Sequence, residues 1–368
     1  MKIIFSSNIS WSIYNFRLSL LKSLQKEGHE IFTVASEDKY SEKLVEAGFT
    51  FEAIDINNNS INPIEDLKTI YKYYKIYKKI KPDVICHNAI KPNIYGTIAA
   101  GLLKIPTINN ISGLGTLFIK KSFTTKIGKL LYRFSQKKAS KVFFQNNEDF
   151  NLFVDNNLVK KDKSQVIPGS GVNTDRFKPK KTIKRDGNFK FLFIGRLLYH
   201  KGIREYIDAI KILRKEYPLV EFNILGSLYI ANSTFVSRDE LTSWVDEKLV
   251  NYLGETDTVE EVLKTVDCVV LPSYREGLSK VLVEASSMAL PIVTTNVSGC
   301  KDVVIDNETG FLCKVKSSED LSQKMEKMLM LTKNERILMG QKARERAIKV
   351  FDEKIIINHY KNAIHSVV

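Results

Sequence analysis

Short apolar runs of β-forming residues alternate with longer amphipathic segments along most of this 368-residue chain. Such alternation is typical of parallel βαβ units, in which helices bury both faces of a sheet. In the first half, six runs are predicted as strands, at residues 2–7, 30–35, 50–56, 83–87, 106–111 and 141–146. Helices are predicted at 15–27 and 63–80, the second with Asn62 as N-cap and Pro63 at its first position. The first half therefore predicts a doubly wound α/β domain.

The pattern stops at residues 173–188, a polar stretch that predicts a linker. It then restarts, with strands predicted at 190–195, 221–226, 251–254, 268–272 and 291–296 and helices at 202–216, 258–265, 279–289 and 318–331. We therefore predict two Rossmann-like domains, residues 1–175 and 176–348, with residues 349–368 as a helix that returns to the first domain. Because ligands of such sheets bind beyond the carboxyl ends of the strands, we expect the parallel sheets to face an interdomain cleft.

The chain is basic, with 56 Lys and Arg against 42 Asp and Glu and a net charge of +14, which favours an anionic partner. No acidic residue lies between Asp83 and Glu148. The first residues lack the long apolar stretch of a secretory signal, and no apolar run reaches the roughly 18 residues of a spanning helix. We therefore expect a cytoplasmic protein, either free or bound to the face of a membrane.

Several common catalytic and metal-binding motifs are absent. The four cysteines form no Cys-x-x-Cys pair, and the five histidines show no ligand spacing, so neither a disulfide scaffold nor a metal site is predicted. The chain has no Walker loop, no complete dinucleotide fingerprint, no His-Glu-x-x-His helix and no Gly-x-Ser-x-Gly elbow. These absences disfavour an ATPase, a dehydrogenase, a zinc hydrolase and a serine hydrolase.

The first motif that carries chemistry is GRLLYHKG, residues 195–202. Gly195 ends a predicted strand, Arg196 and Lys201 lie in the following loop, and Gly202 opens a helix. A guanidinium, an ammonium and a helix N-terminus together suit a diphosphate. The alternative is that both cations are ordinary solvated side chains.

The second motif is PSYREGLSKVLVE, residues 272–284. Glu276 precedes a predicted helix and Glu284 lies two turns into it, so both carboxylates can face one cleft. Carboxylates accept hydrogen bonds well from the hydroxyls of a sugar or a ribose. The alternative is that Glu276 only caps the helix and Glu284 lies on the surface.

These two motifs, in this order and about 80 residues apart, resemble those of the family 4 glycosyltransferases of the GT-B fold. The resemblance spans nearly the whole chain, with matching stretches at 9–36, 91–100, 112–118, 166–177, 195–202 and 271–313. It implies that the first domain binds the acceptor and the second binds a nucleotide sugar.

The resemblance also assigns roles within the second domain. It implies that Arg196 and Lys201, next to Gly195, hold the donor diphosphate. It implies that Glu276 contacts the donor sugar as the catalytic residue and that Glu284 holds the ribose. Backbone amides that meet the phosphates are expected around Gly277, Leu278 and Ser279, although the family usually has Phe-Gly where this chain has Leu278-Ser279. Lys280 could add a phosphate contact or could face solvent.

In the first domain the chain departs from the family. Ser12 and Asn15 stand where the family usually has a Gly-Gly loop, and Ser112 lies in the stretch where many members have a histidine. These three are candidates for contacting donor or acceptor. His87 could face the cleft, and its alternative is a structural role.

With YNFRLSL, KPNIYG and SGLGTLF, these departures resemble a narrower group that extends lipid-linked oligosaccharides for capsule, O-antigen or protein glycosylation. The resemblance implies a retaining hexosyltransferase that needs neither a metal nor a cofactor. The donor would be a UDP-sugar, often an N-acetylhexosamine, and the acceptor a polyprenyl diphosphate-linked saccharide.

Residues 120–141 hold eight Lys and Arg together with apolar residues at helical spacing. A basic amphipathic helix suits anionic lipid headgroups, so we predict contact with the inner face of the cell membrane through Lys126, Lys129, Arg133 and Lys137. Segment 68–81, with six lysines and four tyrosines, could also lie at the membrane interface. The alternative is that Phe123, Ile127, Leu130 and Phe134 face the core and the lysines are merely solvated.

Two rival functions stay open. A non-hydrolysing nucleotide-sugar epimerase shares the architecture but acts on a soluble sugar and would not need a basic first domain. A nucleic-acid-binding protein would explain the charge and the Lys–Tyr interleaving but would leave Arg196, Lys201, Glu276 and Glu284 without a purpose. We therefore expect no nucleic-acid partner.

Overall fold

The computed structural model describes residues 1–57, 62–113, 123–179, 187–228 and 234–368. The chain forms two compact units: unit 1 is residues 1–171 with 353–368, and unit 2 is residues 172–352. The predicted boundaries lie at 175/176 and 348/349, and the structure moves each by four residues. The reason is local pairing, because Val172 bridges to Asp352 and Thr174 donates a hydrogen bond to the Asp352 carboxylate at 2.6 Å.

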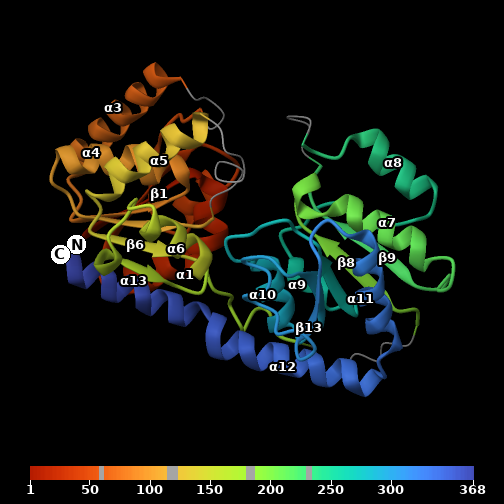
Figure 1. Cartoon of the computed structure of the whole chain (residues 1–368). Helices are drawn as coiled ribbons and strands as arrows, with labels where there is room; N and C mark the ends of the chain where they lie inside the picture. The colour runs from red at the N-terminus through yellow and green to blue at the C-terminus, as the bar shows by residue number, and fades with distance from the viewer. Residues whose placement is uncertain (58–61, 114–122, 180–186, 229–233) are drawn as a thin grey trace. The chain divides into compact units, whose positions relative to one another are not determined.

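Unit 1 is built on a parallel sheet flanked by helices (Figure 1). The sheet has seven strands in the order β3-β2-β1-β4-β5-β6-β7. Its strands are β1 (Lys2–Ile9), β2 (Glu30–Ser36), β3 (Thr50–Ala53), β4 (Val84–Asn88), β5 (Thr107–Ile111), β6 (Lys141–Phe144) and β7 (Ser164–Val166). The helices are α1 (Ser10–Lys26), α2 (Ser41–Glu46), α3 (Pro63–Ile80), the π-helical turn η1 (Pro92–Gly96), α4 (Thr97–Leu102), α5 (Phe123–Gln136), α6 (Asn147–Asp155), the short 3₁₀ helix η3 (Lys161–Lys163) and α13 (Glu353–Val367). The three-residue strand β7 escaped prediction because it is too short to show an apolar pattern.

Helices bury both faces of this sheet, as the apolar strands predicted. Tyr73 and Tyr77 of α3 pack in one core with Tyr132 of α5 and Phe153 of α6. A second core, on residues of α1, α2 and α13, covers the other face. The C-terminal helix α13 is fastened to unit 1 by Tyr360, whose hydroxyl accepts a hydrogen bond from the side chain of Asn110 at 2.9 Å.

Unit 2 contains a parallel six-stranded sheet with the order β10-β9-β8-β11-β12-β13. Its strands are β8 (Lys190–Ile194), β9 (Glu221–Leu225), β10 (Asn251–Tyr252), β11 (Cys268–Leu271), β12 (Ile292–Thr295) and β13 (Gly310–Cys313). The helices are η4 (Tyr199–Lys201, 3₁₀), α7 (Ile203–Leu213), α8 (Arg238–Asp246), α9 (Val259–Leu263), α10 (Lys280–Ser287), α11 (Ser318–Met330) and α12 (Lys333–Phe351). The sequence analysis missed β13, α8 and α12. Both units are doubly wound parallel α/β domains, so the predicted fold class is confirmed.

Over the described ranges, no helix combines the length and the apolar character needed to cross a bilayer.

Candidate active site

The two sequence motifs follow neighbouring strands of unit 2. Strands β8 and β11 pair in parallel, with Phe191 opposite Cys268, and lie at the centre of the sheet. The carboxyl ends of parallel strands meet at one edge, where such sheets bind ligands. The loop after β8 and the loop after β11 therefore lie side by side at that edge.

Backbone contacts fasten the two loops to each other. The carbonyl oxygen of His200 accepts a hydrogen bond from the Tyr274 amide at 2.9 Å. Gly202, which opens α7 with a φ of +78°, lies against the second loop, since a Cβ there would be 2.1 Å from the Pro272 carbonyl oxygen. Only glycine permits both this backbone conformation and this close approach.

The central contact of the site is an ion pair between the two motifs. Lys201 Nζ lies 2.5 Å from Glu276 Oε1, and the two side chains are 17% and 12% exposed. The lysine predicted to hold phosphate and the glutamate predicted to contact the sugar are therefore direct neighbours. An arriving anion would compete with Glu276 for the ammonium group.

Arg196 is positioned differently from Lys201. It is exposed, and its guanidinium makes no hydrogen bond or ion pair with the part of the chain that the structure describes. Between the two cations along the chain, His200 is half-buried, and burial together with the charge of Lys201 lowers its pKa. Because Arg196 is exposed, its guanidinium is available to an anionic ligand.

The loop of Glu276 is held from the other side by the segment after β12. The Glu276 amide donates to the Ser298 carbonyl at 3.1 Å and the Ser279 amide donates to the Gly299 carbonyl at 2.9 Å. Of the amides predicted to meet phosphates, that of Ser279 is therefore already engaged. Helix α10 begins directly after Ser279, with no acidic residue in its first turn and no side-chain cap, so its positive end is not neutralised locally.

Glu284 lies inside the protein rather than on its surface. Its side chain is 10% exposed, and burial raises the pKa of its carboxyl group. The Lys280 ammonium lies 3.8 Å away, one turn earlier on α10. The alternative of a surface glutamate is therefore wrong.

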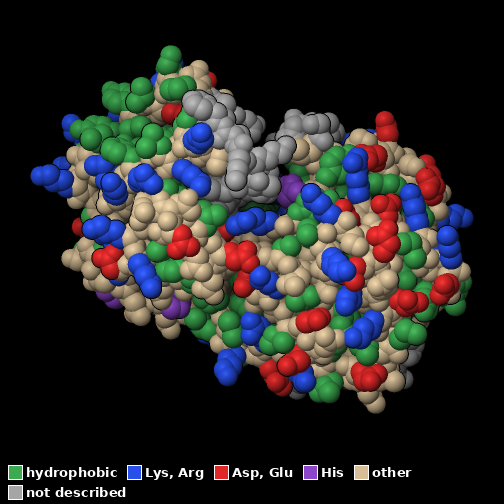
Figure 2. All heavy atoms as spheres, viewed as in Figure 1, with side chains coloured by type: hydrophobic (Ala, Val, Ile, Leu, Met, Phe, Trp, Pro, Cys, Tyr) green, Lys and Arg blue, Asp and Glu red, His purple; other side chains and the backbone are tan. Residues whose placement is uncertain are grey.

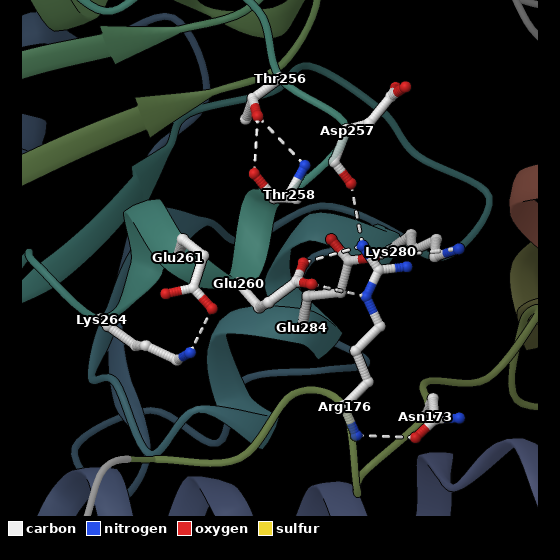
Figure 3. A network of polar contacts seen from close by, with 10 residues as sticks. All are labelled: Asn173, Arg176, Thr256, Asp257, Thr258, Glu260, Glu261, Lys264, Lys280 and Glu284. Atoms are coloured by element: carbon white, nitrogen blue, oxygen red, sulfur yellow. Dashed lines mark hydrogen bonds and ion pairs between the residues drawn. The ribbon is translucent and has the colours of Figure 1, made fainter.

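A charged network that the sequence analysis did not foresee surrounds Glu284 (Figure 3). Arg176 forms two hydrogen bonds to the carboxylate of Glu260 on α9, at 2.9 and 2.8 Å, and a third to the Asp257 carbonyl at 2.9 Å. Glu284 points toward the Arg176 guanidinium, whose charge favours the ionised carboxylate (Figure 3). No local signal could have paired residues 84 positions apart.

The candidates in unit 1 fall into buried and accessible groups. His87 is fully buried, where its ring bonds the Tyr77 hydroxyl at 2.8 Å and Asn109 at 2.9 Å. Burial lowers the pKa of His87 to about 4, so the ring is neutral and structural. Ser12 is half-buried on α1, Asn15 donates to the Trp11 carbonyl one turn earlier at 3.0 Å, and Ser112 is exposed directly after β5.

Of the four basic residues predicted to meet a membrane, Lys126, Lys129 and Arg133 lie on α5, and Lys137 follows its last residue directly. Lys126 and Lys137 are exposed. Lys129 and Arg133 instead bond Asn156, through its side-chain oxygen at 3.0 Å and its carbonyl at 2.9 Å. Among the described residues, no cluster of three or more His, Cys, Asp or Glu side chains could hold a metal ion.

Comparison with known proteins agrees with this geometry. Residues 2–146 match the family model of the glycosyl transferase 4-like domain, and residues 174–346 match that of the glycosyl transferases group 1. An N,N'-diacetylbacillosaminyl-diphospho-undecaprenol alpha-1,3-N-acetylgalactosaminyltransferase of Campylobacter jejuni is 29% identical over 98% of this chain and 97% of its own length. The capsular polysaccharide biosynthesis glycosyltransferase CapM of Staphylococcus aureus is 26% identical over 91% of this chain and 90% of its own.

Among solved structures, HepE of Anabaena in complex with UDP and glucose superposes with a TM-score of 0.83 at 18% identity, over the full length of both chains. The fold is therefore that of the GT-B glycosyltransferases. This chain belongs to the group 1, GT4-like glycosyltransferases and is an enzyme of that class.

Proposed function

We propose that this enzyme is a retaining glycosyltransferase that moves an N-acetylhexosamine from a UDP-sugar to a polyprenyl diphosphate-linked saccharide. The observation that carries the proposal is the Lys201–Glu276 pair at 2.5 Å, where the two motif loops meet. One side of this pair suits phosphate and the other suits sugar hydroxyls. It acts peripherally at the inner face of the cell membrane, in capsule, O-antigen or protein glycan synthesis.

The names of the relatives support the choice of acceptor and sugar. The Campylobacter relative is named as an N-acetylgalactosaminyltransferase that acts on a diphospho-undecaprenol-linked sugar. A relative from Escherichia coli, 28% identical over 70% of this chain, is named as a galactosyltransferase that acts on a GlcNAc-diphosphoundecaprenol. Matches of this kind favour a lipid-linked acceptor over the soluble sugar of an epimerase.

In the proposed reaction, the acceptor hydroxyl oxygen bonds the anomeric carbon as the bond from that carbon to the UDP oxygen breaks. The acceptor proton passes to an oxygen of the departing diphosphate on the same face of the sugar, so the configuration is retained. Arg196, Lys201 and the positive end of α10 stabilise the charge that develops on UDP. No metal or cofactor takes part.

The remaining site residues position the donor. When the diphosphate engages Lys201, the Glu276 carboxylate is released to accept hydrogen bonds from the donor sugar. Glu284 accepts hydrogen bonds from the ribose hydroxyls. Burial raises the pKa of its carboxyl group, and the charges of Lys280 and Arg176 oppose that rise by favouring the ionised form.

The test is a screen of UDP-sugars against lipid-linked acceptors, read by mass spectrometry of the lipid product. We expect one UDP-N-acetylhexosamine to add a single sugar to the acceptor. Conversion of the donor to an epimer with no acceptor present would refute transfer in favour of epimerisation. Salt-dependent retention on DNA, without binding to anionic vesicles, would favour nucleic-acid binding instead.

A further inference from the structure

Three helices cover neighbouring parts of one face of the unit 1 sheet. Their inner sides share a single core, to which α3 contributes Tyr73 and Tyr77, α4 contributes Ala99 and α5 contributes Tyr132. Figure 1 shows α3, α4 and α5 next to one another on this face. Because the core occupies only their inner sides, the composition of their outer sides is not explained by folding.

The outer sides of these helices expose large apolar side chains, here called the apolar surface. Its members are Ile64, Leu67 and Tyr71 of α3, Leu102 of α4, and Ile127, Leu130 and Phe134 of α5. Their exposed fractions run from 44% at Ile127 to 66% at Leu67. Figure 2 shows hydrophobic side chains gathered over these helices. Single exposed apolar residues are ordinary, but a group of this kind marks an interaction site.

The apolar surface is built by the same spacing on both long helices. Residues 64, 67 and 71 of α3, and residues 127, 130 and 134 of α5, each follow an i, i+3, i+7 pattern that places them on one side of a helix. Helix α4 adjoins the turn after α5 at Gly101, where a Cβ would lie 2.7 Å from Cδ of Lys138. The Lys138 ammonium in turn lies 5.4 Å from the centre of the Phe134 ring.

Positive charge borders the apolar surface. Exposed lysines flank it: Lys68, Lys75 and Lys78 on α3, Lys126 on α5, and Lys137 and Lys138 in the turn directly after α5. The Lys75 ammonium lies 4.6 Å from the centre of the Tyr71 ring, at the edge of the apolar residues. Opposing charge is scarce, because α3 has only Glu65 and Asp66, both half-buried, and no acidic residue occurs between Asp83 and Glu148.

We propose that the apolar surface enters the acyl region of an anionic lipid bilayer while its lysine border contacts the headgroups. Charge complementarity selects this occupant, because lysine is depleted from protein–protein interfaces whereas basic and apolar residues together favour an anionic bilayer. The proposal rests on the proposed function, since a polyprenyl-linked acceptor is held in such a bilayer. It adds α4 and the exposed apolar side chains of α3 and α5 to a contact that the sequence analysis assigned to four basic residues.

The sequence analysis left open that the apolar residues of α5 face the core. Ile127, Leu130 and Phe134 are exposed instead, so that alternative is wrong for these three. Phe123 lies outside the described side chains.

The test is flotation of the full-length protein with vesicles of phosphatidylcholine and phosphatidylglycerol. The variant Leu67→Ser/Leu102→Ser/Leu130→Ser removes side chains that are 66%, 63% and 65% exposed, so it should fold normally. The matched control, Leu219→Ser/Met330→Ser/Leu338→Ser, removes side chains of unit 2 that are 72%, 75% and 54% exposed. We expect the first variant to lose about tenfold or more in bound fraction and the control to bind like the wild type.

Salt separates apolar from electrostatic attachment. At about 1 M salt the Debye length is about 3 Å, so an apolar anchor should keep the wild type on the vesicles while a purely ionic one releases it. Equal flotation of the Leu67/Leu102/Leu130 variant and the wild type would overturn the proposal. So would a wild-type dimer in light scattering that this variant abolishes, because a second copy would then cover the surface.

Transfer assays keep this proposal separate from the proposed function. The Leu67/Leu102/Leu130 variant should transfer sugar normally to an acceptor in detergent micelles and poorly to the same acceptor in vesicles. If the wild type transfers sugar to neither but flotation still depends on the apolar surface, the proposed function fails and the membrane surface stands.

Discussion

Gly299 supports the loop that carries Glu276 through a contact that can be tested directly. It has a φ of +79°, and a Cβ at this position would lie 2.5 Å from the Glu276 carbonyl oxygen and 2.6 Å from the Glu276 Cβ. In Gly299→Ala, the left-handed backbone costs about 1–2 kcal/mol. Relief of the two contacts by movement of the Glu276 loop costs about 1–3 kcal/mol more. We therefore expect a loss of about 2–5 kcal/mol in the free energy of unfolding.

A second glycine provides the matched control for stability. Gly254 has a φ of +72° in the same unit, but a Cβ there would meet nothing within 4 Å. Gly254→Ala should therefore cost only the backbone part, about 1–2 kcal/mol. For a unit of this size each kcal/mol lowers Tm by about 2–4 °C, so circular dichroism should separate the two variants.

Enzyme activity gives a second test of the contact between Gly299 and Glu276. Displacement of Glu276 by about 1 Å is expected to lower kcat/KM for the UDP-sugar roughly 100-fold in Gly299→Ala. Gly28→Ala, with a φ of +82° and open space in unit 1, should retain wild-type activity. If Gly299→Ala is as stable as Gly254→Ala and turns over normally, then Gly299 does not hold the Glu276 loop and the reasoning is refuted.

Three further predictions follow from the charges of the two units. Lys201→Ala should weaken UDP binding about 10- to 100-fold in calorimetry, because a charge-assisted contact to the diphosphate is lost, whereas Lys211→Ala should not; wild-type affinity would remove Lys201 from the diphosphate site. Glu284→Gln should lower transfer about 10-fold or more yet raise the free energy of unfolding at neutral pH, since burial raises the pKa of this carboxyl and its ionisation costs stability. That gain should shrink as the pH falls toward the ordinary pKa of 4.5, and a gain independent of pH in denaturant titrations would contradict it. Burial lowers the pKa of His87 from 6.5 to about 4 in the folded state. The free energy of unfolding should therefore fall by up to about 3 kcal/mol as the pH falls from 6.5 to 4, because protonation favours the unfolded chain. His87→Asn should flatten this part of the pH–Tm profile.

The site differs from the sequence prediction mainly in its contacts. The resemblance carried by the two motifs predicted that Lys201 and Glu276 share a site. The structure brings them together because each follows a buried strand and those strands pair. Periodicity and capping, however, describe only local structure. They contain no information about Arg176 reaching Glu260 or about Gly299 approaching Glu276, both of which depend on long-range pairing of loops.

The sequence pattern of α3 also could not predict which of its sides is buried. Its inner side carries Tyr73 and Tyr77, and its outer side carries Leu67 and Tyr71. A helix with apolar residues on both sides has no unique inner side by pattern alone, so only packing against the sheet decides which tyrosines are buried.

By itself, the amino-acid sequence determined the two βα alternations, the polar stretch that separates them, and the charged loops that follow strands β8 and β11. These features are local, because strand and helix periods, caps and turn residues act over a few positions. Tertiary structure alone decided that Lys201 pairs with Glu276, that His87 is buried and neutral, and that α3 and α5 expose apolar stripes. Those outcomes depend on which surfaces the sheet covers and which it leaves to solvent, and that is set by contacts between residues far apart in the chain.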